Sequence, residues 1–447
     1  MQRDLSAIFK AYDIRGVVPS ELDEDAARRI GAATVDFLAA PRIILGRDAR
    51  PSSPALAAAF IEGATGRGAD VVDIGLAATD LVYFASGDLG LPAAMLTASH
   101  NPPEYNGIKL CRERAGPIGE ESGLREIRAL AEAGPGPGGH RGAVTVEVVL
   151  DRFVEHLLGL VDVESIRPLS VVTDTANGMG GLTVPAVFDR LPVKLVPLYL
   201  ELDGTFPNHP ADPIVPENLR DLRAAVVEHG ADLGLAFDGD ADRVFLVDER
   251  AEGVSGSLVT ALVAQGMLER EPGAGVIHNL ICSRVVPEVV REHGGTPIRS
   301  RVGHSFIKQL MAETEAIFGG EHSGHFYFRE LFRADSGLTA ALIVLERLST
   351  AGVTLSELLA PYQRYAASGE INSEVADPPA TIERVAAAFG DGKQDRLDGL
   401  TVDYRDWWFN VRPSNTEPLL RLNVEASDAG LLEERTAAVL DVIRVAA

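Results

Sequence analysis

Three aspartates stand at alternate positions in the segment LAFDGDADRVFLVDE (residues 235–249), between two apolar runs. In an extended turn this spacing points the carboxylates of Asp238, Asp240 and Asp242 to one side, as a hard divalent cation requires. Three like charges without a cation would repel one another, so a solvated acidic turn is the less favoured interpretation. The segment therefore predicts a metal site.

An EF-hand calcium loop is an alternative for this segment, because Glu249 occupies the twelfth position counted from Asp238. Arg243, however, stands at the sixth position, where the sharp turn requires glycine, and the flanking runs are typical of strands rather than helices. We therefore expect Mg²⁺, which takes a few carboxylates and completes its shell with phosphate or water.

A second polar segment, LTASHNPPEYNGIKL (residues 96–110), places a serine, a histidine and a lysine around a proline-rich turn. A phosphate on Ser99 would add about −2 of charge to the three carboxylates, more than one divalent cation neutralises. Arg243 and Lys109 are candidates for the missing positive charge, and His100 is placed to donate a hydrogen bond to a phosphate oxygen. Considered alone, the segment is also compatible with an ordinary N-capping serine.

A glycine-rich loop in FGGEHSGHFYF (residues 318–328) carries short polar side chains: Glu321, His322, Ser323 and His325. Zinc binding by the two histidines is one interpretation. Their spacing of three lies in a Gly-Ser loop, however, whereas zincins use a spacing of four on a helix. Hydrogen bonding to several sugar hydroxyls suits this loop better.

The segment RPSNTEP (residues 412–418) places an arginine before a tight polar turn. A guanidinium, side-chain hydroxyls and backbone N–H groups together suit a dianionic phosphate. The residues concerned are Arg412, Ser414, Asn415 and Thr416. Alone, the segment is equally compatible with an ordinary asparagine-containing turn.

Short apolar runs alternate with amphipathic stretches between about residues 40 and 350. This alternation is typical of α/β layers, and we expect its strands and helices to position the loops. Three runs that begin as a strand and continue in a polar turn hint at repeated α/β domains: residues 42–50, 169–181 and 275–284. Towards the C-terminus, two aromatic or apolar strands within 401–426 and a helix at 429–445 predict a smaller α+β domain.

The length of 447 residues suggests several domains, at the usual size of roughly 100–200 residues each. A segment rich in glycine and proline, AEAGPGPGGHRGA (residues 131–143), marks the first boundary, and we place a hinge before the last domain near residues 361–370. We expect domains that carry the serine, metal, sugar and phosphate loops in turn: 1–140, 141–250, 251–362 and 363–447.

The composition argues against several functional classes. A formal net charge of −24 disfavours nucleic acid as a partner. The apolar stretches fall short of the roughly 18 residues of a membrane span, and the charged first residues are unlike a signal peptide, so we expect a cytoplasmic protein without a membrane partner. Cys111 and Cys282 give no disulfide framework and are expected to be buried thiols.

The four loops, in this order and over nearly the whole chain, resemble those of the α-D-phosphohexomutase superfamily, in its phosphomannomutase/phosphoglucomutase branch. T-A-S-H-N-P is similar to the phosphoserine loop of that superfamily, D-G-D-A-D-R to its metal loop, G-E-H-S-G-H to its sugar loop and R-P-S-N-T-E-P to its phosphate loop. FKAYDIRG (residues 9–16) resembles the N-terminal signature and adds Tyr12 and Arg15 to the substrate-binding residues. The resemblance implies three similar α/β/α domains with mixed sheets and a smaller C-terminal α+β domain, around one central cleft.

The resemblance also implies an isomerase acting on hexose phosphates. Phosphoserine at Ser99 would donate its phosphoryl group to a hexose 1- or 6-phosphate, with Mg²⁺ held by the three aspartates and the phosphate on Ser99. The resulting hexose 1,6-bisphosphate, which also serves as activator, would turn end for end before its other phosphate returns to the serine. A monomer and a homodimer are both compatible with the sequence.

Further roles come from the same resemblance. Lys109 would be the general acid or base, which requires its pKa to be lowered. His304, in RVGHSFIK (residues 301–308), resembles an additional histidine of the cleft, and Lys308 would add positive charge. The sugar hydroxyls and the non-reacting phosphate would be held by two sets of residues: Glu321, Ser323 and His325, and Arg412, Ser414, Asn415 and Thr416.

The sugar loop bears on the substrate. Glu-His-Ser-Gly-His is closer to phosphomannomutases and dual mannose/glucose enzymes than to phosphoglucosamine mutases, whose metal loop tends to carry glycine where Ala241 stands. Mannose phosphates are therefore the first expectation, with glucose phosphates or both sugars as alternatives, because discrimination at one hydroxyl is worth only about 1–3 kcal/mol. This chain departs from the usual pattern at Ser257, where relatives often carry aspartate, and at His322, which varies with subgroup.

Two rival functions use the same residues. A catalytically silent sugar-phosphate sensor would keep the cleft but transfer nothing, and the presence of Ser99, Lys109 and the three aspartates argues against it. A Mg²⁺-dependent phosphatase would form a labile acyl phosphate on Asp238 instead of a stable ester on Ser99.

Overall fold

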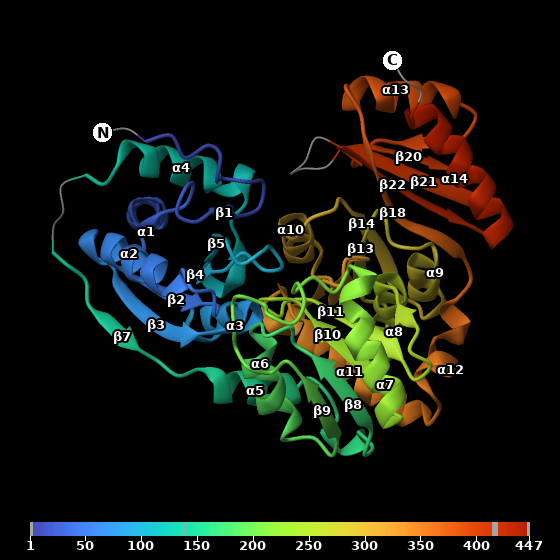
Figure 1. Cartoon of the computed structure of the whole chain (residues 1–447), viewed down its shortest axis with the longest axis horizontal. Coiled ribbons are helices and arrows are strands. Elements are labelled where there is room, and N and C mark those ends of the chain that lie inside the picture. Colours follow the sequence, from blue (N-terminus) through green and yellow to red (C-terminus); the bar gives the residue numbers. More distant parts are fainter. Residues whose placement is uncertain (1–2, 137–139, 414–418, 445–447) are drawn as a thin grey trace.

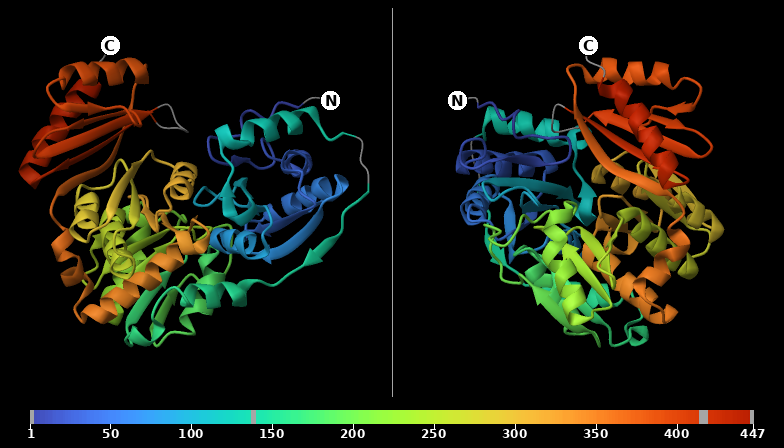
Figure 2. Two further views of the ribbon diagram at one scale, coloured as in Figure 1. Left: turned by 180° about the vertical axis from the view of Figure 1, so that it is seen from behind. Right: turned by 45° about the vertical axis from the view of Figure 1, so that its right-hand side comes forward.

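The computed structural model describes residues 3–136, 140–413 and 419–444. Within these residues the chain forms four β-sheets, built one after another along the sequence (Figure 1). The first and last sheets lie on opposite sides of the molecule, and the second and third lie between and below them in the view of Figure 1, as the view from behind also shows (Figure 2).

The first three sheets share one strand order. Three neighbouring strands are parallel, and two further strands follow, each antiparallel to the strand before it. In the first sheet these are β3 (Asp70–Leu76), β2 (Arg42–Arg47), β4 (Ala93–Leu96), β5 (Tyr105–Arg112) and β1 (Ile14–Val17). In the second they are β9 (Lys194–Leu198), β8 (Ser170–Asp174), β10 (Leu233–Phe237), β11 (Val244–Asp248) and β12 (Gly253–Val254). In the third they are β14 (Thr296–Ser300), β13 (Gly275–Asn279), β15 (Phe318–Gly320), β16 (Phe326–Phe328) and β17 (Ala334–Asp335).

The first sheet carries two additions to this common order. β6 (Gly116–Pro117) pairs with β5, and β7 (Val144–Val146) extends the sheet beyond β3. Because β7 follows the glycine-rich segment, the first sheet recruits chain beyond residue 140.

Helices cover both faces of the first sheet, and the side chains of β2 show how. Ile43 and Leu45 pack in the cluster that contains α1 (Glu24–Leu38), α2 (Ser53–Gly66) and α4 (Leu124–Ala133), whereas Ile44 faces the cluster that contains α3 (Thr79–Leu89). This alternation is the period of a strand buried on both sides.

The second and third sheets are covered in the same way by helices and short 3₁₀ turns. The helices are α5 (Leu150–Leu158), α6 (Gly180–Phe188), α7 (Arg220–His229), α8 (Gly256–Arg270), α9 (Val285–Glu292), α10 (His304–Thr314), α11 (Gly337–Ala351) and α12 (Leu355–Leu359). The 3₁₀ turns of the chain are η1 (Glu113–Ala115), η2 (Glu120–Ser122), η3 (Val163–Ser165), η4 (Pro216–Leu219), η5 (Arg329–Leu331) and η6 (Ala360–Tyr362). One cluster of buried apolar side chains runs through all three domains, so they pack as a unit.

The last domain is an antiparallel sheet with helices on one face. Its strands, in spatial order, are β18 (Ala366–Glu374), β22 (Leu419–Ala426), β21 (Trp407–Pro413), β20 (Leu400–Asp403) and β19 (Lys393–Asp395), and its helices are α13 (Pro378–Ala388) and α14 (Ala429–Arg444). Residues 401–426 hold parts of three strands rather than the two predicted, because the turn between β20 and β21 contains no glycine or proline to mark it. The apolar core of this domain is a separate cluster.

Both cysteines, Cys111 and Cys282, are buried and unpaired as expected. Among the described residues, no single helix is long and apolar enough to cross a membrane. Of these residues, only the bent pair of α11 with the segment Leu355–Tyr362 passes the same test of length and composition. The side chains of α11 are mostly buried within the protein.

Candidate active site

Three of the predicted loops occupy the same position in the repeated strand order, namely the turn from the third parallel strand to the first antiparallel strand. The serine loop joins β4 to β5, the metal loop joins β10 to β11 and the sugar loop joins β15 to β16. They surround a cavity of about 110 Å³. The residues lining it are Tyr12, Asp13, Arg15, Tyr83, Ser99, His100, Lys109, Asp242, Arg243, His304, His325 and Asp335.

Ser99 lines this cavity, and its backbone is in the left-handed region, with a φ of 50°. Its hydroxyl donates a hydrogen bond to Asp238 Oδ2 at 2.7 Å, and its Oγ lies 3.2 Å from Nδ1 of His100. A non-glycine residue in this conformation is uncommon and is held by its surroundings. The metal loop approaches so closely that a Cβ on Gly239 would lie 2.4 Å from the backbone oxygen of Ser99.

Arg50 holds the serine loop from behind and was not predicted from the sequence. Its buried guanidinium donates to four backbone oxygens of that loop, at distances between 2.6 and 3.0 Å: those of Ser99, Asn101, Pro102 and Tyr105. Asp48 accepts from Arg50 Nε at 3.0 Å and balances its charge. The signal in the sequence was only a polar turn after a strand.

The three aspartates are buried, and their ligand atoms lie within 4.8 Å of one another. Oδ1 of Asp240 and Oδ1 of Asp242 are buried without a hydrogen-bond donor. Burial, together with the charges of its two neighbours, raises the pKa of Asp238 to about 7, although Arg243 opposes that shift. Orphaned carboxylate oxygens in so acidic a cluster suit a hard divalent cation.

An EF-hand is ruled out by the position of Glu249. Its carboxylate accepts hydrogen bonds from the backbone N–H, at 3.1 Å, and from the hydroxyl of Ser356, and it takes no part in the cluster of three aspartates. Strands β10 and β11 flank the loop, as the sequence indicated.

Lys109 corrects one expectation. It extends from β5, and its Nζ lies 2.7 Å from Asp240 Oδ2 and 2.6 Å from Asp242 Oδ2. Burial alone would lower the pKa of Lys109, but these two carboxylates outweigh burial and raise the pKa well above its usual value. In this arrangement Lys109 carries a proton, which suits the acid or an electrostatic group; of the two roles that we expected, acid or base, the base would need the lowered pKa that is not found here.

Arg243 and His100 also lie beside Ser99. Arg243 Nε donates to Asp238 Oδ2 at 3.0 Å, so the carboxylate oxygen that accepts from Ser99 also pairs with a guanidinium. Burial, followed by the charges of Arg243 and Arg15, lowers the pKa of His100 well below its usual value and keeps the ring neutral.

Asp335, at the end of β17, pairs with two basic side chains of the third domain and was not predicted from the sequence. Its Oδ2 lies 3.0 Å from Nδ1 of His325, and its Oδ1 lies 2.7 Å from Nζ of Lys308. Nζ of Lys308 also lies 3.7 Å from the ring centroid of Tyr83. Lys308 is therefore paired, rather than a free positive charge in the cleft.

The sugar loop is only partly open to the cavity. Glu321 is buried and accepts from Tyr327 Oη at 2.7 Å and from Asn279 Nδ2 at 3.0 Å. Ser323 is half-buried within the loop. Among the described residues, His322 and His325 do not belong to one group that could hold a metal ion; His325 lies instead with Asp242 and Asp335. The geometry therefore does not favour zinc binding by the two histidines.

The N-terminal signature reaches across to the third domain. Tyr12 Oη donates to the backbone oxygen of Val302 at 3.1 Å, and its ring meets that of His304 edge to face at 5.5 Å between centroids. Arg15, on β1, donates to Asn101 Oδ1 at 2.5 Å and thereby contacts the serine loop. Burial raises the pKa of Tyr12 to about 12, so its hydroxyl remains a donor.

Of the predicted phosphate loop, the structure describes Arg412 and Pro413, and neither of them lines the cavity. Arg412 lies on β21 and pairs with Glu370 of β18 at 3.0 Å. The predicted residues Ser414, Asn415 and Thr416 lie outside the described residues.

Comparisons with known proteins give the same arrangement of domains. Domain models of phosphoglucomutase/phosphomannomutase match the chain in order: α/β/α domain I over residues 6–135, domain II over 151–253, domain III over 255–365 and the C-terminal domain over 370–442. The chain belongs to this family. The predicted superfamily, the fold class and the class of enzyme, a phosphohexomutase, are thereby confirmed.

Individual relatives of the family cover the chain almost completely. A protein named phosphomannomutase from Salmonella montevideo is 44% identical and aligns with 97% of this chain and 98% of its own length. A protein named phosphohexose mutases from Xanthomonas campestris pv. campestris is 43% identical, over 98% of this chain and 99% of its own length. The crystal structure of a phosphoglucomutase/phosphomannomutase family protein from Burkholderia thailandensis superimposes with a TM-score of 0.90 at 33% identity, covering 99% of this chain and 98% of that one.

Proposed function

We propose that this phosphohexomutase interconverts mannose 6-phosphate and mannose 1-phosphate through a phosphoserine at Ser99 and a hexose 1,6-bisphosphate. The observation that carries the proposal is the buried contact between the Ser99 hydroxyl and Asp238, inside a cluster of three carboxylates. The names of relatives that are 43–44% identical support mannose phosphates as substrates. Glucose phosphates, alone or together with mannose phosphates, are the alternative.

Each half-reaction moves one phosphoryl group. In the first half-reaction the bond between phosphorus and Oγ of Ser99 breaks, a new bond forms to the free hydroxyl of the hexose phosphate, and the hydroxyl proton passes to a base. In the second half-reaction the other phosphate of the bisphosphate passes to Oγ of Ser99, and the sugar oxygen that it leaves takes the proton back. The candidate base is the cavity-lining imidazole of His304, which is neutral because burial, followed by Lys308, lowers its pKa well below its usual value. The negative charge of a bound phosphate would raise that pKa and help the ring to take the proton. Lys109 and Arg243, both beside the aspartates, stabilise the charge on the transferring group.

The acidic cluster fits Mg²⁺, because Asp240 Oδ1 and Asp242 Oδ1 are buried without a donor and lie close to Asp238. Bound there, the ion would neutralise charge on the phosphoryl oxygens. A hexose 1,6-bisphosphate would serve as activator by phosphorylating Ser99. The distal phosphate of either orientation would be held by Arg412 and the loop that follows it, and the sugar hydroxyls by Glu321 and its neighbours.

The decisive test is Ser99→Ala with exposed Ser6→Ala as a matched control. We expect Ser99→Ala to lose nearly all turnover and to bind hexose phosphates with little change, while the control behaves as wild type. Phosphopeptide mass spectrometry after incubation with hexose 1,6-bisphosphate should find a stable ester on Ser99. An acyl phosphate on Asp238 would instead support the phosphatase, and binding without any turnover in the wild type would support the sensor.

Substrate preference needs its own assay. A coupled measurement of kcat/KM for mannose 1-phosphate, glucose 1-phosphate and glucosamine 1-phosphate, with Mg²⁺ and a trace of bisphosphate, compares the three sugars directly. We expect mannose 1-phosphate to be the best of them. If kcat/KM were higher for glucose 1-phosphate, glucose phosphates would replace mannose phosphates as the proposed substrates, and the proposed mechanism would stand.

A further inference from the structure

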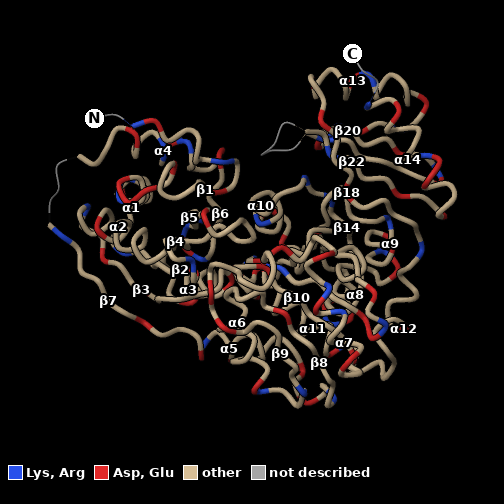
Figure 3. The backbone as a smooth tube through the Cα atoms, viewed as in Figure 1, with Lys and Arg blue, Asp and Glu red and all other residues tan. Residues whose placement is uncertain are grey.

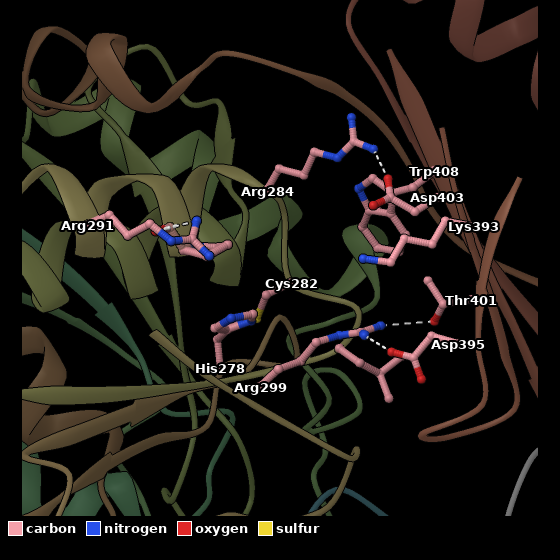
Figure 4. A pocket seen from close by; sticks show the side chains of 12 residues that line it. His278, Cys282, Arg284, Arg291, Arg299, Lys393, Asp395, Thr401, Asp403 and Trp408 are labelled. Carbon is pink, nitrogen blue, oxygen red and sulfur yellow. Dashed lines mark hydrogen bonds and ion pairs between the residues drawn. The ribbon is translucent and has the colours of Figure 1, made fainter. Parts of the chain in front are cut away.

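A second cavity, of about 360 Å³, lies between the third and fourth domains and has no role in the proposed reaction (Figure 4). One wall comes from β13, α9 and β14, and the other from β19, β20 and β21. We call it the interdomain cavity. Among the described residues, those that line it are all different from those that line the cavity around Ser99.

Cations outnumber carboxylates in this lining. Four basic side chains face two acidic ones: Arg284, Arg291, Arg299 and Lys393 against Asp395 and Asp403. Arg284 pairs with Asp403 and Arg299 with Asp395, and each pair joins the third domain to the fourth. Arg299 also donates to Thr401 Oγ1 at 3.1 Å.

Among the described residues, the remaining two cations have no carboxylate partner. Within the part of the chain that the structure describes, Arg291 and Lys393 form no ion pair; Arg291 donates only to the backbone oxygen of Pro287, at 3.2 Å. Figure 4 shows the two side chains reaching into the cavity from opposite walls. The formal charge of the lining is therefore +2, carried by two cations from different domains.

This local charge contrasts with the rest of the protein. The chain as a whole carries −24, and its basic residues are scattered among more numerous acidic ones (Figure 3). A concave site of one sign concentrates counter-ions even in a protein of the same sign as the ion. The volume also lies within the roughly 300–1,000 Å³ of small-molecule sites, which occur preferentially between domains.

We propose that the interdomain cavity binds a small phosphorylated anion with at least two negative charges, held between Arg291 and Lys393. Such an anion would neutralise the unpaired charge of both walls, and a guanidinium and an ammonium are the two groups that proteins use most for phosphate. Apolar side chains of Leu280, Pro287 and Trp408 also line the cavity and leave room for the remainder of a phosphate ester. An anion that contacts both walls favours the arrangement of domains in which the two cations are close.

The cavity contains its own reporter. The chain has two tryptophans, and only Trp408 lines the cavity among the described residues, whereas Trp407 stacks on Tyr404 in the core of the last domain. In a Trp407→Phe background, the fluorescence of Trp408 can be followed while inorganic pyrophosphate is added without Mg²⁺ at constant ionic strength. We expect a saturable change that equivalent ionic strength from NaCl does not produce.

Charge-removing variants identify the site. In that background, the pair Arg291→Gln/Lys393→Gln should weaken pyrophosphate binding at least tenfold, and both positions are exposed, so folding should be unaffected. A matched pair, Arg396→Gln/Arg405→Gln, removes the same charge from exposed positions of the last domain outside the cavity and should bind as the background does.

The active-site variant Arg412→Gln should also bind pyrophosphate as the background does, which separates this site from the proposed function. Three results would each overturn the proposal. The first is the absence of a saturable fluorescence change. The second is an affinity for pyrophosphate in the Arg291→Gln/Lys393→Gln variant equal to that of the background. The third is an equal loss of affinity in the control pair or in Arg412→Gln. Melting curves without pyrophosphate check that every variant is folded.

Discussion

Replacing Arg50 by lysine tests whether the serine loop is held from behind. The guanidinium forms five contacts at once, four to backbone oxygens of the loop and one to Asp48. Lysine keeps the positive charge that Asp48 requires but offers only three donors from a single point. At least two of the five contacts must therefore be lost in Arg50→Lys.

The magnitude follows from those contacts. A hydrogen bond that involves a charged group contributes about 1.5–3 kcal/mol, so two lost bonds cost about 3–6 kcal/mol before water or local relaxation compensates. We expect the free energy of unfolding to fall by about 3 kcal/mol. A displacement of the nucleophile by about 1 Å costs on the order of 100-fold in rate, so kcat should fall by about that factor. KM should change much less, because the proposed sugar and phosphate contacts come from other loops.

The assay is steady-state kinetics with denaturant unfolding of Arg50→Lys, and Arg28→Lys is the control. Arg28 forms an exposed ion pair with Glu62 in the same domain, and its replacement should alter stability by less than about 0.5 kcal/mol. If folded Arg50→Lys kept kcat within twofold of wild type, the guanidinium would not be what positions the serine. An increase confined to KM would refute the same reasoning.

Four further predictions follow from single contacts. Gly239→Ala would place a methyl group 2.4 Å from a backbone oxygen of the serine loop, so kcat should fall more than tenfold, as steady-state assays would show. Lys109→Met should lower kcat more than it changes KM, because a charge needed in the transition state is lost. Asp335→Asn should lower kcat by weakening the hold on His325, and the pH–rate profile should shift with it, which a purely structural role would not produce. Burial lowers the pKa of His278 from 6.5 to about 4. Between these pH values the unfolded chain binds a proton that the folded chain does not, so the free energy of unfolding decreases as the pH falls from 6.5 to 4. His278→Asn should reduce that decrease by about 3 kcal/mol, measured as unfolding at a series of pH values.

The loops could be predicted from the sequence because their chemistry is local. Three aspartates within five positions indicate a metal site without any knowledge of the fold, whereas the serine segment alone was also compatible with an ordinary N-cap and took its interpretation from the resemblance. The positions that hold the loops could not be predicted in this way. Arg50 lies 49 positions before Ser99, and nothing in its own surroundings in the sequence indicates that its partners are backbone oxygens.

The same limit explains the wrong direction predicted for the pKa of Lys109. Its charge and its place after the serine loop were visible in the sequence, but the carboxylates that set its pKa lie 131 and 133 positions away. A pKa depends on which charges are neighbours in space, and those two carboxylates come from a different domain. A lysine shortly after a predicted phosphoserine suggested a general acid or base with a lowered pKa, whereas the fold places its ammonium group against two carboxylates of the metal loop.

The repeated strand order explains why three unrelated loop sequences meet at one cavity. Each loop is the turn from the third parallel strand to the first antiparallel strand of its sheet, so a repeated topology places it at the same edge, and one continuous apolar core fixes the three sheets against each other. The serine, the aspartates and the sugar loop are therefore a rigid constellation. The last domain has a core of its own and meets the third domain through polar pairs such as that of Arg284 with Asp403. Moving it would break ion pairs rather than a shared apolar core. The phosphate that we propose for Arg412 could then be repositioned while the reacting groups stay in place.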